Sequence, residues 1–190
     1  VLTVHDIGHY LFGLKGWRRK IYKWIWLALP IRLAKRVTAV SAATRDHIVE
    51  HLSFSREKIT VVENCYHPMY RPVPKAFNSG CPRILQVGTK PYKNVPRLIR
   101  ALQGIPCTLI LVGVLDAEIR AALEETEVSY ENYVGLSQEA LLQHYVAADL
   151  VAFVSIGEGF GVPILEAQAM ARPLITANVP PMSLAAGPGA

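Results

Sequence analysis

The stretch that decides the fold is LVAFVSIGEGFGVPILE, residues 150–166. It begins with an apolar run, Leu150–Ser155, of the kind that forms a strand buried on both faces of a sheet. Three glycines follow at positions 157, 159 and 161, and Pro163 can occupy the first position of a helix, where its missing N–H costs nothing. A strand, a glycine turn and a helix N-terminus are the parts with which α/β proteins offer backbone N–H groups to an anion. The stretch therefore predicts an α/β fold with an anion-binding turn.

Two carboxylates flank this turn, because Glu158 lies within it and Glu166 follows eight residues later. A carboxylate repels a phosphate but accepts hydrogen bonds from hydroxyl groups. We therefore interpret both glutamates as groups that hold hydroxyls, beside a turn that holds phosphate. A ligand with both kinds of group is a nucleotide sugar.

Apolar runs of strand length alternate with helical patterns along the whole chain. The runs are rich in Val, Ile and Leu and mostly unalternating, which predicts parallel sheets covered on both faces in an α/β layered fold. We expect strands at Val1–Val4, Val37–Ser41, Ile59–Glu63, Arg83–Val87, Thr108–Val112, Leu150–Ser155 and Leu174–Thr176, and helices near 15–35, 42–51, 94–103, 115–126, 137–147 and 162–171.

One segment, residues 66–82, breaks this alternation with four prolines, a glycine and no periodicity. Such a composition is typical of a linker. We therefore expect a first domain at 1–65, an interdomain linker at 66–82 and a second domain at 83–190. The chain opens directly in a strand-like run and its last residues, 185–190, predict no closing element. We expect it to be a piece of a longer protein, with both domains incomplete.

Composition excludes several classes of protein. With 51% hydrophobic and 18% charged residues the chain is globular and not disordered. Three cysteines without close spacing argue against a disulfide framework or a zinc site and favour a reducing compartment, hence a cytoplasmic protein. No apolar run reaches the length of about 18 residues that spans a bilayer.

The positive charge is concentrated near the N-terminus. Between Ile7 and Arg45 there are nine basic residues and no acidic ones, and Trp17, Trp24 and Trp26 lie among them. Residues 17–36 therefore fit two interpretations. One is a peripheral contact with the inner face of a membrane, and the other is a core-facing amphipathic helix with a solvated basic side. Nucleic acid is not expected as a partner, because no recognition motif accompanies the charge.

A second candidate loop follows the predicted strand Arg83–Val87 and reads GTKPYKN, residues 88–94. A glycine at a strand end with lysines just beyond it suits a diphosphate, since a lysine ammonium neutralises phosphate as a mobile point charge. In a parallel sheet, ligands bind at the carboxyl ends of strands. We therefore expect this loop and the glycine turn to serve the same ligand.

The stretch from Ser155 to Ala171 resembles the signature of retaining glycosyltransferases of family 4, which have the GT-B fold. The resemblance covers almost the whole chain, because other segments match in the expected order. They are Val4-His5-Asp6, Val40-Ser41, residues 59–64, Val87-Gly88-Thr89 with Lys93-Asn94, and residues 145–150.

The resemblance implies a hexosyltransferase of two Rossmann-like domains with parallel sheets that face each other across a cleft. Such an enzyme moves a hexose, with retention of configuration, from a nucleotide diphosphate sugar to a glycan or lipid-linked acceptor in polysaccharide or glycolipid biosynthesis. It needs no metal and no further cofactor. The family often has an arginine beside the lysine of the diphosphate loop, where this chain has Tyr92 or Thr89.

The resemblance also implies roles for single residues. Glu158 would hold hydroxyls of the donor sugar, Glu166 the ribose hydroxyls, and Lys93 the diphosphate, while His5 would face the donor sugar. The implied catalytic residues are His5, Glu158 and Lys93. The implied donor-binding residues are Gly88, Thr89, Lys90, Asn94, Val134, Gly135, Leu136, Gly159, Phe160, Gly161 and Glu166.

Two other functions are alternatives to a transferase: a dinucleotide binder and a module without catalysis. A dehydrogenase-like dinucleotide binder needs Gly-x-Gly-x-x-Gly after a strand, and the glycines at 157, 159 and 161 do not have that spacing. The alternative that stays open is a truncated or inactive GT-B module that binds a nucleotide sugar or a partner without catalysis, since this fragment alone can lack activity.

Overall fold

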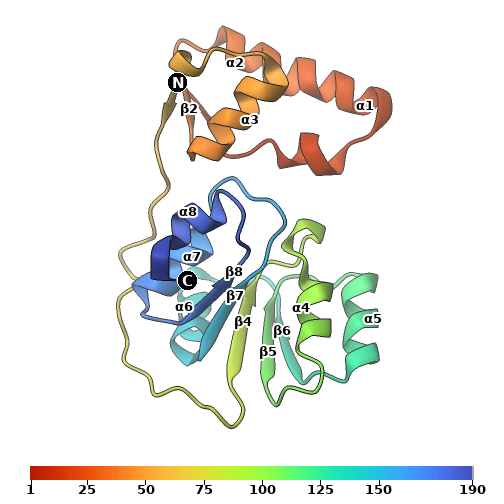
Figure 1. Cartoon of the computed structure of the whole chain (residues 1–190), viewed down its shortest axis with the longest axis vertical. Helices are drawn as coiled ribbons and strands as arrows, with labels where there is room; N and C mark the ends of the chain where they lie inside the picture. The colour runs from red at the N-terminus through yellow and green to blue at the C-terminus, as the bar shows by residue number, and fades with distance from the viewer. Residues whose placement is uncertain (190) are drawn as a thin grey trace. The chain divides into compact units, whose positions relative to one another are not determined.

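The computed structural model describes residues 1–189 and divides the chain into two compact units, each with its own parallel sheet (Figure 1). The first unit comprises Val1–Cys65 together with Gly157–Gly161 and Val179–Ala185. The second comprises Tyr66–Ile156 and Val162–Asn178, and the chain from Ala186 onward. The glycine turn is thus grouped with the first unit although the strand before it and the helix after it belong to the second.

The first unit has a three-stranded parallel sheet in the order β1-β2-β3, with Leu2 opposite Val37 and Val37 opposite Ile59. Its buried core includes Ile31, Val37 and Ile48. The elements are β1 (Leu2–Val4), η1 (His9–Gly13), α1 (Gly16–Ile21), η2 (Tyr22–Ala28), α2 (Leu29–Leu33), β2 (Val37–Ala39), α3 (Ala42–Leu52), η3 (Arg56–Lys58) and β3 (Ile59–Val61).

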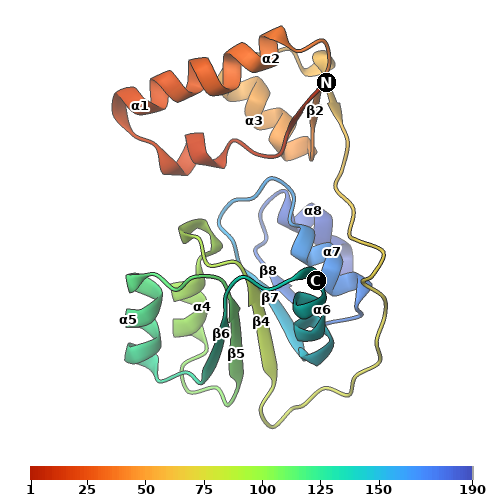
Figure 2. The same cartoon turned by 180° about the vertical axis from the view of Figure 1, so that it is seen from behind.

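The predicted helix at 15–35 is one continuous rod of three parts, visible from both sides in Figures 1 and 2. Its middle, η2, is a π-helix, whose wider turns usually occur only as short insertions in α-helices. Pro30 lies where the π-helical part passes into α2, and it offers no N–H to the backbone hydrogen bonds of the rod at that point. The sequence pattern located this helix but not its π-helical turns, because the change in hydrogen-bond register between the two helix types shifts the spacing of a helix face by less than one residue per turn.

The second unit has a five-stranded parallel sheet in the order β6-β5-β4-β7-β8. Numbered within the unit, this is the order 3-2-1-4-5 of a Rossmann-like sheet, and the order reverses between β4 and β7. The elements are β4 (Arg83–Val87), η4 (Pro91–Lys93), α4 (Val95–Ala101), β5 (Thr108–Val112), α5 (Ala117–Thr126), β6 (Tyr130–Tyr133), α6 (Gln138–Ala147), β7 (Leu150–Phe153), α7 (Val162–Ala169), β8 (Leu174–Thr176), α8 (Met182–Ala186) and η5 (Gly187–Gly189).

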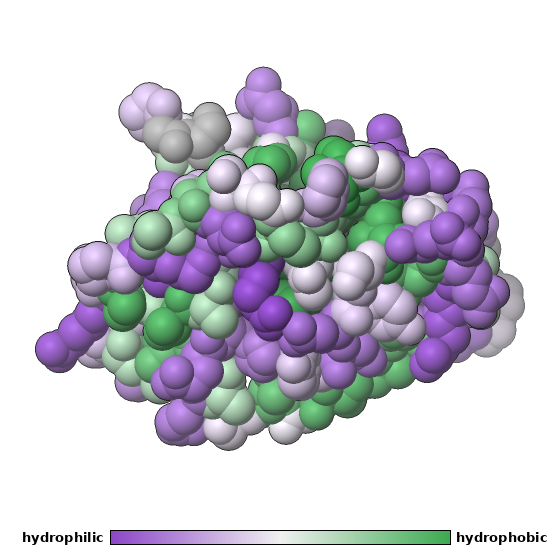
Figure 3. All heavy atoms as spheres, turned by 90° about the horizontal axis from the view of Figure 1, so that it is seen from below, coloured by the Kyte–Doolittle hydropathy of each residue, from purple (hydrophilic) through white to green (hydrophobic). Residues whose placement is uncertain are grey.

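Helices cover both faces of this sheet (Figure 2). One buried cluster joins α4 and α5 to Leu109 and Leu111 of β5, and another joins α6 and α7 to Leu85 of β4 and Val151 of β7. Strands buried on both faces need apolar residues at every position, which explains the unalternating runs in the sequence. On the surface shown in Figure 3, hydrophilic residues are spread among hydrophobic ones, as on most globular proteins.

Several features differ from the predicted pattern, among them η1, which lies where no helix was predicted. The strand β6 was not predicted, because its residues Tyr-Glu-Asn-Tyr alternate in exposure at a sheet edge and lack an apolar run. The helix α8 and the turn η5 lie where no closing element was expected.

Among residues 1–189, no helix is both long and apolar enough to cross a bilayer.

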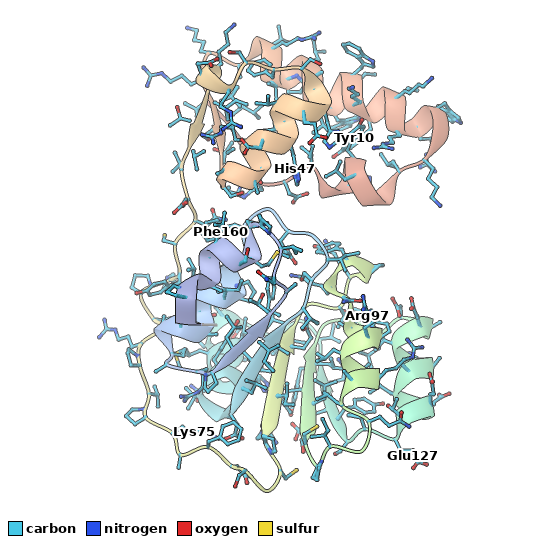
Figure 4. All side chains as sticks on the ribbon, in the orientation of Figure 1. Tyr10, His47, Lys75, Arg97, Glu127 and Phe160 are labelled. Carbon is cyan, nitrogen blue, oxygen red and sulfur yellow. The ribbon has the colours of Figure 1, made fainter. Side chains whose placement is uncertain are left out.

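The segment predicted as a linker, residues 66–82, has neither helix nor strand but packs on the second unit. Tyr70 is buried in the cluster beside α6 and α7. Val73 accepts a hydrogen bond from Nη1 of Arg172 at 2.8 Å, and Lys75, which Figure 4 labels, forms an ion pair with Asp149. The segment is therefore an ordered edge of the second unit in this structure.

Candidate functional site

Two loops leave the sheet of the second unit at the point where its strand order reverses, one after β4 and one after β7. They are joined by two hydrogen bonds. The amide of Ile156 donates to the carbonyl of Tyr92 at 2.9 Å, and Nδ2 of Asn94 donates to the carbonyl of Val154 at 3.2 Å. In open α/β sheets this crevice is where ligands bind.

Lys93 lies directly at this reversal point. Its side chain crosses Gly88, whose φ of +88° is in the left-handed region, and a Cβ added there would lie 2.9 Å from the Cε atom of Lys93. The ammonium group lies 4.5 Å from the ring centroid of Phe153, at the end of β7. Gln86, which was not predicted, is buried and donates from Nε2 to the carbonyl of Gly88 at 2.9 Å. The glycine thus leaves room for a lysine held between the two central strands.

Thr89 and Lys90 lie on another side of the same loop. The hydroxyl of Thr89 donates to the carbonyl of Val114 at 2.7 Å, so it ties the loops after β4 and β5 together. Lys90 and Asn94 line a cavity of about 140 Å³ with Arg97, labelled in Figure 4. The structure therefore gives Thr89 a role in loop architecture and places both Thr89 and Lys90 beside this cavity, and their predicted contact with the donor stays a prediction.

The glycine turn is held by the first unit, to which its residues are assigned. The carbonyl of Gly159 accepts hydrogen bonds from the hydroxyls of Ser41, at 2.6 Å, and Thr44, at 3.0 Å. A Cβ at position 159 would lie 1.8 Å from the carbonyl oxygen of His5, at the carboxyl end of β1. Only glycine fits there, so the structure brings His5 and the turn together through their backbones.

Ser41 and Thr44 were missed as functional candidates. Ser41 is the N-cap of α3, and its hydroxyl accepts a hydrogen bond from the amide of Thr44 at 3.0 Å. Both are buried. The available signal was a serine just before a helical pattern, which predicts a cap but not a contact with the glycine turn.

The other residues of the glycine turn, Glu158, Phe160 and Gly161, lead into α7. Phe160, labelled in Figure 4, is buried, and Gly161 has a φ of +105° that favours glycine. Glu158 is half-buried. The helix α7 begins at Val162, so Pro163 is its second residue and not its first as predicted. Either position precedes the first intrahelical N–H bond, so the proline costs no hydrogen bond.

Glu166 is the fifth residue of α7 and only 9% exposed. Its Oε2 accepts a hydrogen bond of 2.6 Å from the hydroxyl of Tyr145, which is fully buried. The ring of Tyr70 meets that of Tyr145 edge to face at 5.4 Å. Burial, followed by the nearby charge of Glu166, raises the pKa of both tyrosines, so both remain protonated at neutral pH. The bond between Tyr145 and Glu166 was not predicted from the sequence.

The turn Val134-Gly135-Leu136, whose residues the resemblance implied to bind the donor, follows β6 at the edge of the sheet. Gly135 has a φ of +69°, which suits a tight turn, and Val134 is exposed. The ring of the preceding Tyr133 lies 4.2 Å from that of His144 in α6, centroid to centroid, with the two ring planes tilted by 50°. The turn therefore lies two strands away from Lys93, along the same carboxyl edge of the sheet.

Asp149 is a structural residue. Its carboxylate accepts backbone hydrogen bonds from Asn78 at 3.0 Å and Arg83 at 2.8 Å, and it pairs with Lys75. Burial raises the pKa of Asp149, but these hydrogen bonds and the ammonium of Lys75 outweigh burial and leave the pKa lowered. Asp149 thus fastens the segment 66–82 to the second unit.

Known proteins resemble the chain along both units. The family model described as Glycosyltransferase Family 4 matches residues 1–68, and the model described as Glycosyl transferases group 1 matches residues 81–187. The O-antigen chain mannosyltransferase RfbU of Salmonella typhimurium is 26% identical over 94% of this chain and 52% of its own length. The chain therefore spans about half the length of this curated relative.

Two solved structures share the fold. WaaG, a glycosyltransferase involved in lipopolysaccharide biosynthesis, matches 97% of this chain and 58% of its own with a TM-score of 0.76 and 17% identity. Alr3699/HepE of Anabaena, solved with UDP-glucose, matches 93% of this chain and 52% of its own with a TM-score of 0.73 and 21% identity. The predicted fold class, partial GT-B with parallel sheets, is thereby confirmed. Because one family model matches more than half of its residues, the chain belongs to the glycosyl transferases group 1 family.

Proposed function

We propose that the protein containing this chain moves a hexose from a nucleotide diphosphate sugar to a glycan or lipid-linked acceptor. The observation that carries the proposal is where two groups of the second unit lie along the chain and in its sheet. Lys93 lies over Gly88 where the strand order reverses, and Glu166 lies in the helix that follows the glycine turn. HepE with UDP-glucose and the O-antigen enzyme RfbU support this donor and acceptor class.

In this proposal each group acts on one part of the donor. Lys93 neutralises the charge that builds on the diphosphate as the sugar leaves, which is the electrostatic part of catalysis. Glu166 accepts hydrogen bonds from the ribose hydroxyls. Glu158 holds hydroxyls of the transferred sugar, and His5 faces that sugar.

We propose that transfer retains the anomeric configuration and requires no metal. The bond between the anomeric carbon and the phosphate oxygen breaks while the acceptor oxygen bonds to the same face of that carbon. The acceptor proton passes to the departing phosphate, so no protein nucleophile takes part. NMR of the product gives its anomeric configuration, and transfer that stops with EDTA and returns with added metal would contradict the metal-free proposal.

The test of the site is Glu158→Ala in the full-length protein, with Glu124→Ala on the exposed side of α5 as the control. We expect Glu158→Ala to lower kcat about 100-fold or more, because groups that stabilise the transition state are worth this much. Thermal stability should change little in both variants. A near-normal transfer rate in Glu158→Ala would contradict the proposed transferase site.

The inactive-module alternative makes a different prediction. Calorimetry of the full-length protein with UDP and with GDP measures nucleotide binding without turnover. Binding without transfer would favour a module that has lost catalysis, and no binding of either nucleotide would favour a decayed site.

We also propose that the protein is cytoplasmic, because Cys65, Cys81 and Cys107 are all free thiols. We propose a peripheral membrane contact through residues 17–36, because exposed tryptophans accompany basic side chains in this segment.

A further inference from the structure

The hydroxyl of Tyr70, in the second unit, is buried without a hydrogen-bond partner among residues 1–189. The side chain is only 2% exposed and lies in the cluster beside α6 and α7. A hydroxyl buried without a hydrogen bond costs free energy, whereas a phenylalanine ring in the same place would not carry this cost. Packing alone therefore does not account for a tyrosine at this position.

This hydroxyl lies near the carboxylate of Glu166. Burial, and then the charge of Glu166, raise the pKa of Tyr70, so the group keeps its proton at neutral pH and can donate a hydrogen bond. The two groups do not reach normal hydrogen-bond geometry in this structure. The neighbouring Tyr145 does reach it, since its hydroxyl donates to Oε2 of Glu166 at 2.6 Å. The two tyrosines thus differ in one respect: only one of them is bonded to the carboxylate.

The ring of Tyr70 is held in place by its surroundings. It meets the ring of Tyr145 edge to face, with 5.4 Å between the centroids. The amide of Tyr70 donates to the carbonyl of His67 at 3.0 Å, which closes a short turn of the backbone. Met69 and Val73, from the same segment, pack against the cluster that contains both rings. The position of the hydroxyl is therefore fixed by the segment that carries it.

Arg172 fastens this segment to α6. The side chain of Arg172 is buried, its Nη1 donates to the carbonyl of Val73 at 2.8 Å, and its Nε donates to the carbonyl of Tyr145 at 2.9 Å. One guanidinium thus ties the segment 66–82 to the helix whose tyrosine binds Glu166.

A bound ribose changes the surroundings of Glu166. The side chain is 9% exposed, so water reaches its carboxylate in the free protein. A ribose that donates from its 2′ and 3′ hydroxyls displaces this water and fixes the plane of the carboxylate, whose rotation costs little because the last torsion of glutamate is broad. A carboxylate shielded from water is stabilised by each further donor, and the hydroxyl of Tyr70 is such a donor.

We propose that Tyr70 is a positioning residue for Glu166, and that its hydroxyl donates to this carboxylate once ribose hydroxyls have turned it into the binding orientation. The hydroxyls of Tyr70 and Tyr145 then hold the carboxylate from the buried side, while its outer side accepts from the ribose. The segment 66–82 is thereby part of the nucleotide site and not only a connection between domains. This role of Tyr70 depends on the proposed function, in which Glu166 holds the ribose hydroxyls.

The variant Tyr70→Phe removes only the hydroxyl, and calorimetry of the full-length protein tests it. The probes are UDP and GDP, each beside its 2′,3′-dideoxy form. We expect the variant to bind the ribose form about tenfold more weakly, because a hydrogen bond to a charged group is lost from the complex. Binding of the dideoxy form should change less than about twofold, since it has no hydroxyls to turn the carboxylate.

Thermal unfolding without nucleotide gives the second readout. The midpoint of Tyr70→Phe should equal that of the wild type or exceed it, because the free protein loses no hydrogen bond of this hydroxyl. Tyr66→Phe, in the same segment, is the matched control. Its side chain is 45% exposed, so water replaces the lost group, and both affinities and the midpoint should be unchanged.

Two kinds of result would overturn the role of Tyr70. Unchanged affinity of Tyr70→Phe for the ribose form, an equal loss for both forms, or a lower midpoint without nucleotide would each refute positioning and leave the proposed transferase site intact. Equal binding of the ribose and dideoxy forms by the wild type, or binding of neither UDP nor GDP, would instead refute the role of Glu166, and the role of Tyr70 with it.

Discussion

Replacing Tyr145 with phenylalanine removes one oxygen atom and with it the 2.6 Å hydrogen bond to Oε2 of Glu166. Ring packing against Tyr70 is retained, since that contact is edge to face at 5.4 Å and does not use the hydroxyl of Tyr145. A hydrogen bond to a charged group contributes about 1.5–3 kcal/mol, and both partners are buried here. We therefore expect the free energy of unfolding of Tyr145→Phe to fall by about 2 kcal/mol.

The matched control is Tyr133→Phe, which removes a similar bond of 2.7 Å to Oε2 of Glu131 at a partly exposed site. There we expect a loss of about 1 kcal/mol or less, because water replaces the lost donor. Urea unfolding measures both variants. Equal losses would refute the view that burial makes the bond to Glu166 strong.

The same variant tests the role of Glu166. If this carboxylate holds the ribose, a less well-oriented carboxylate should weaken UDP binding about fivefold in calorimetry, for about 1 kcal/mol of lost preorganisation. Because the pKa of Tyr145 is raised, the difference between wild type and variant should not depend on pH near neutrality. Unchanged UDP affinity together with the expected loss of stability would show that Glu166 is structural and leave the fold assignment intact.

Three further changes have defined outcomes. Gly159→Ala places a Cβ 1.8 Å from the carbonyl oxygen of His5, so the glycine turn must move. We expect thermal unfolding to show a free energy of unfolding lower by about 1–3 kcal/mol, and wild-type stability would contradict this geometry. The bidentate hydrogen bonds from Arg83 lower the pKa of Glu131 to about 2. The stability that this ion pair contributes is therefore fully present above the ordinary pKa of a glutamate and is lost as pH falls from about 4.5 to about 2. Glu131→Gln should therefore cost about 1 kcal/mol or less at pH 7 and nothing near pH 2, since the pair is partly exposed, and a pH-independent difference in urea unfolding would refute it. Asp149→Asn should cost about 2 kcal/mol and expose the segment 66–82 to limited proteolysis, whereas an unchanged cleavage pattern would show that other contacts hold it.

Much of the second unit could be predicted from its sequence. Every apolar run from Arg83 to Thr176 that was expected to be a strand is one, with ends shifted by at most two residues. Runs buried on both faces leave a strong signal because each position must be apolar. The edge strand β6 left none, since half of its side chains meet water.

The candidate site was predictable only as a set of loops. The motifs around Gly88, Lys93 and Glu158 indicated the candidate site, because glycines and charged residues at the ends of buried strands contribute little to packing. They did not indicate that Lys93 lies over Gly88 or that Tyr70, within a presumed linker, lies in the same cluster as Tyr145. Such contacts join residues far apart in sequence, so no local pattern encodes them.

By itself, the sequence determined the α/β class, the position of the glycine turn and the family resemblance, because hydrophobic periodicity and glycine spacing are local properties of the chain. The tertiary structure alone decided which neighbours each group has. It assigned Tyr145 to Glu166, the hydroxyls of Ser41 and Thr44 to the carbonyl of Gly159, and the tryptophans of residues 17–26 to the solvent. The physical reason is that burial and hydrogen bonding depend on which elements pack together, and packing is a property of the whole fold.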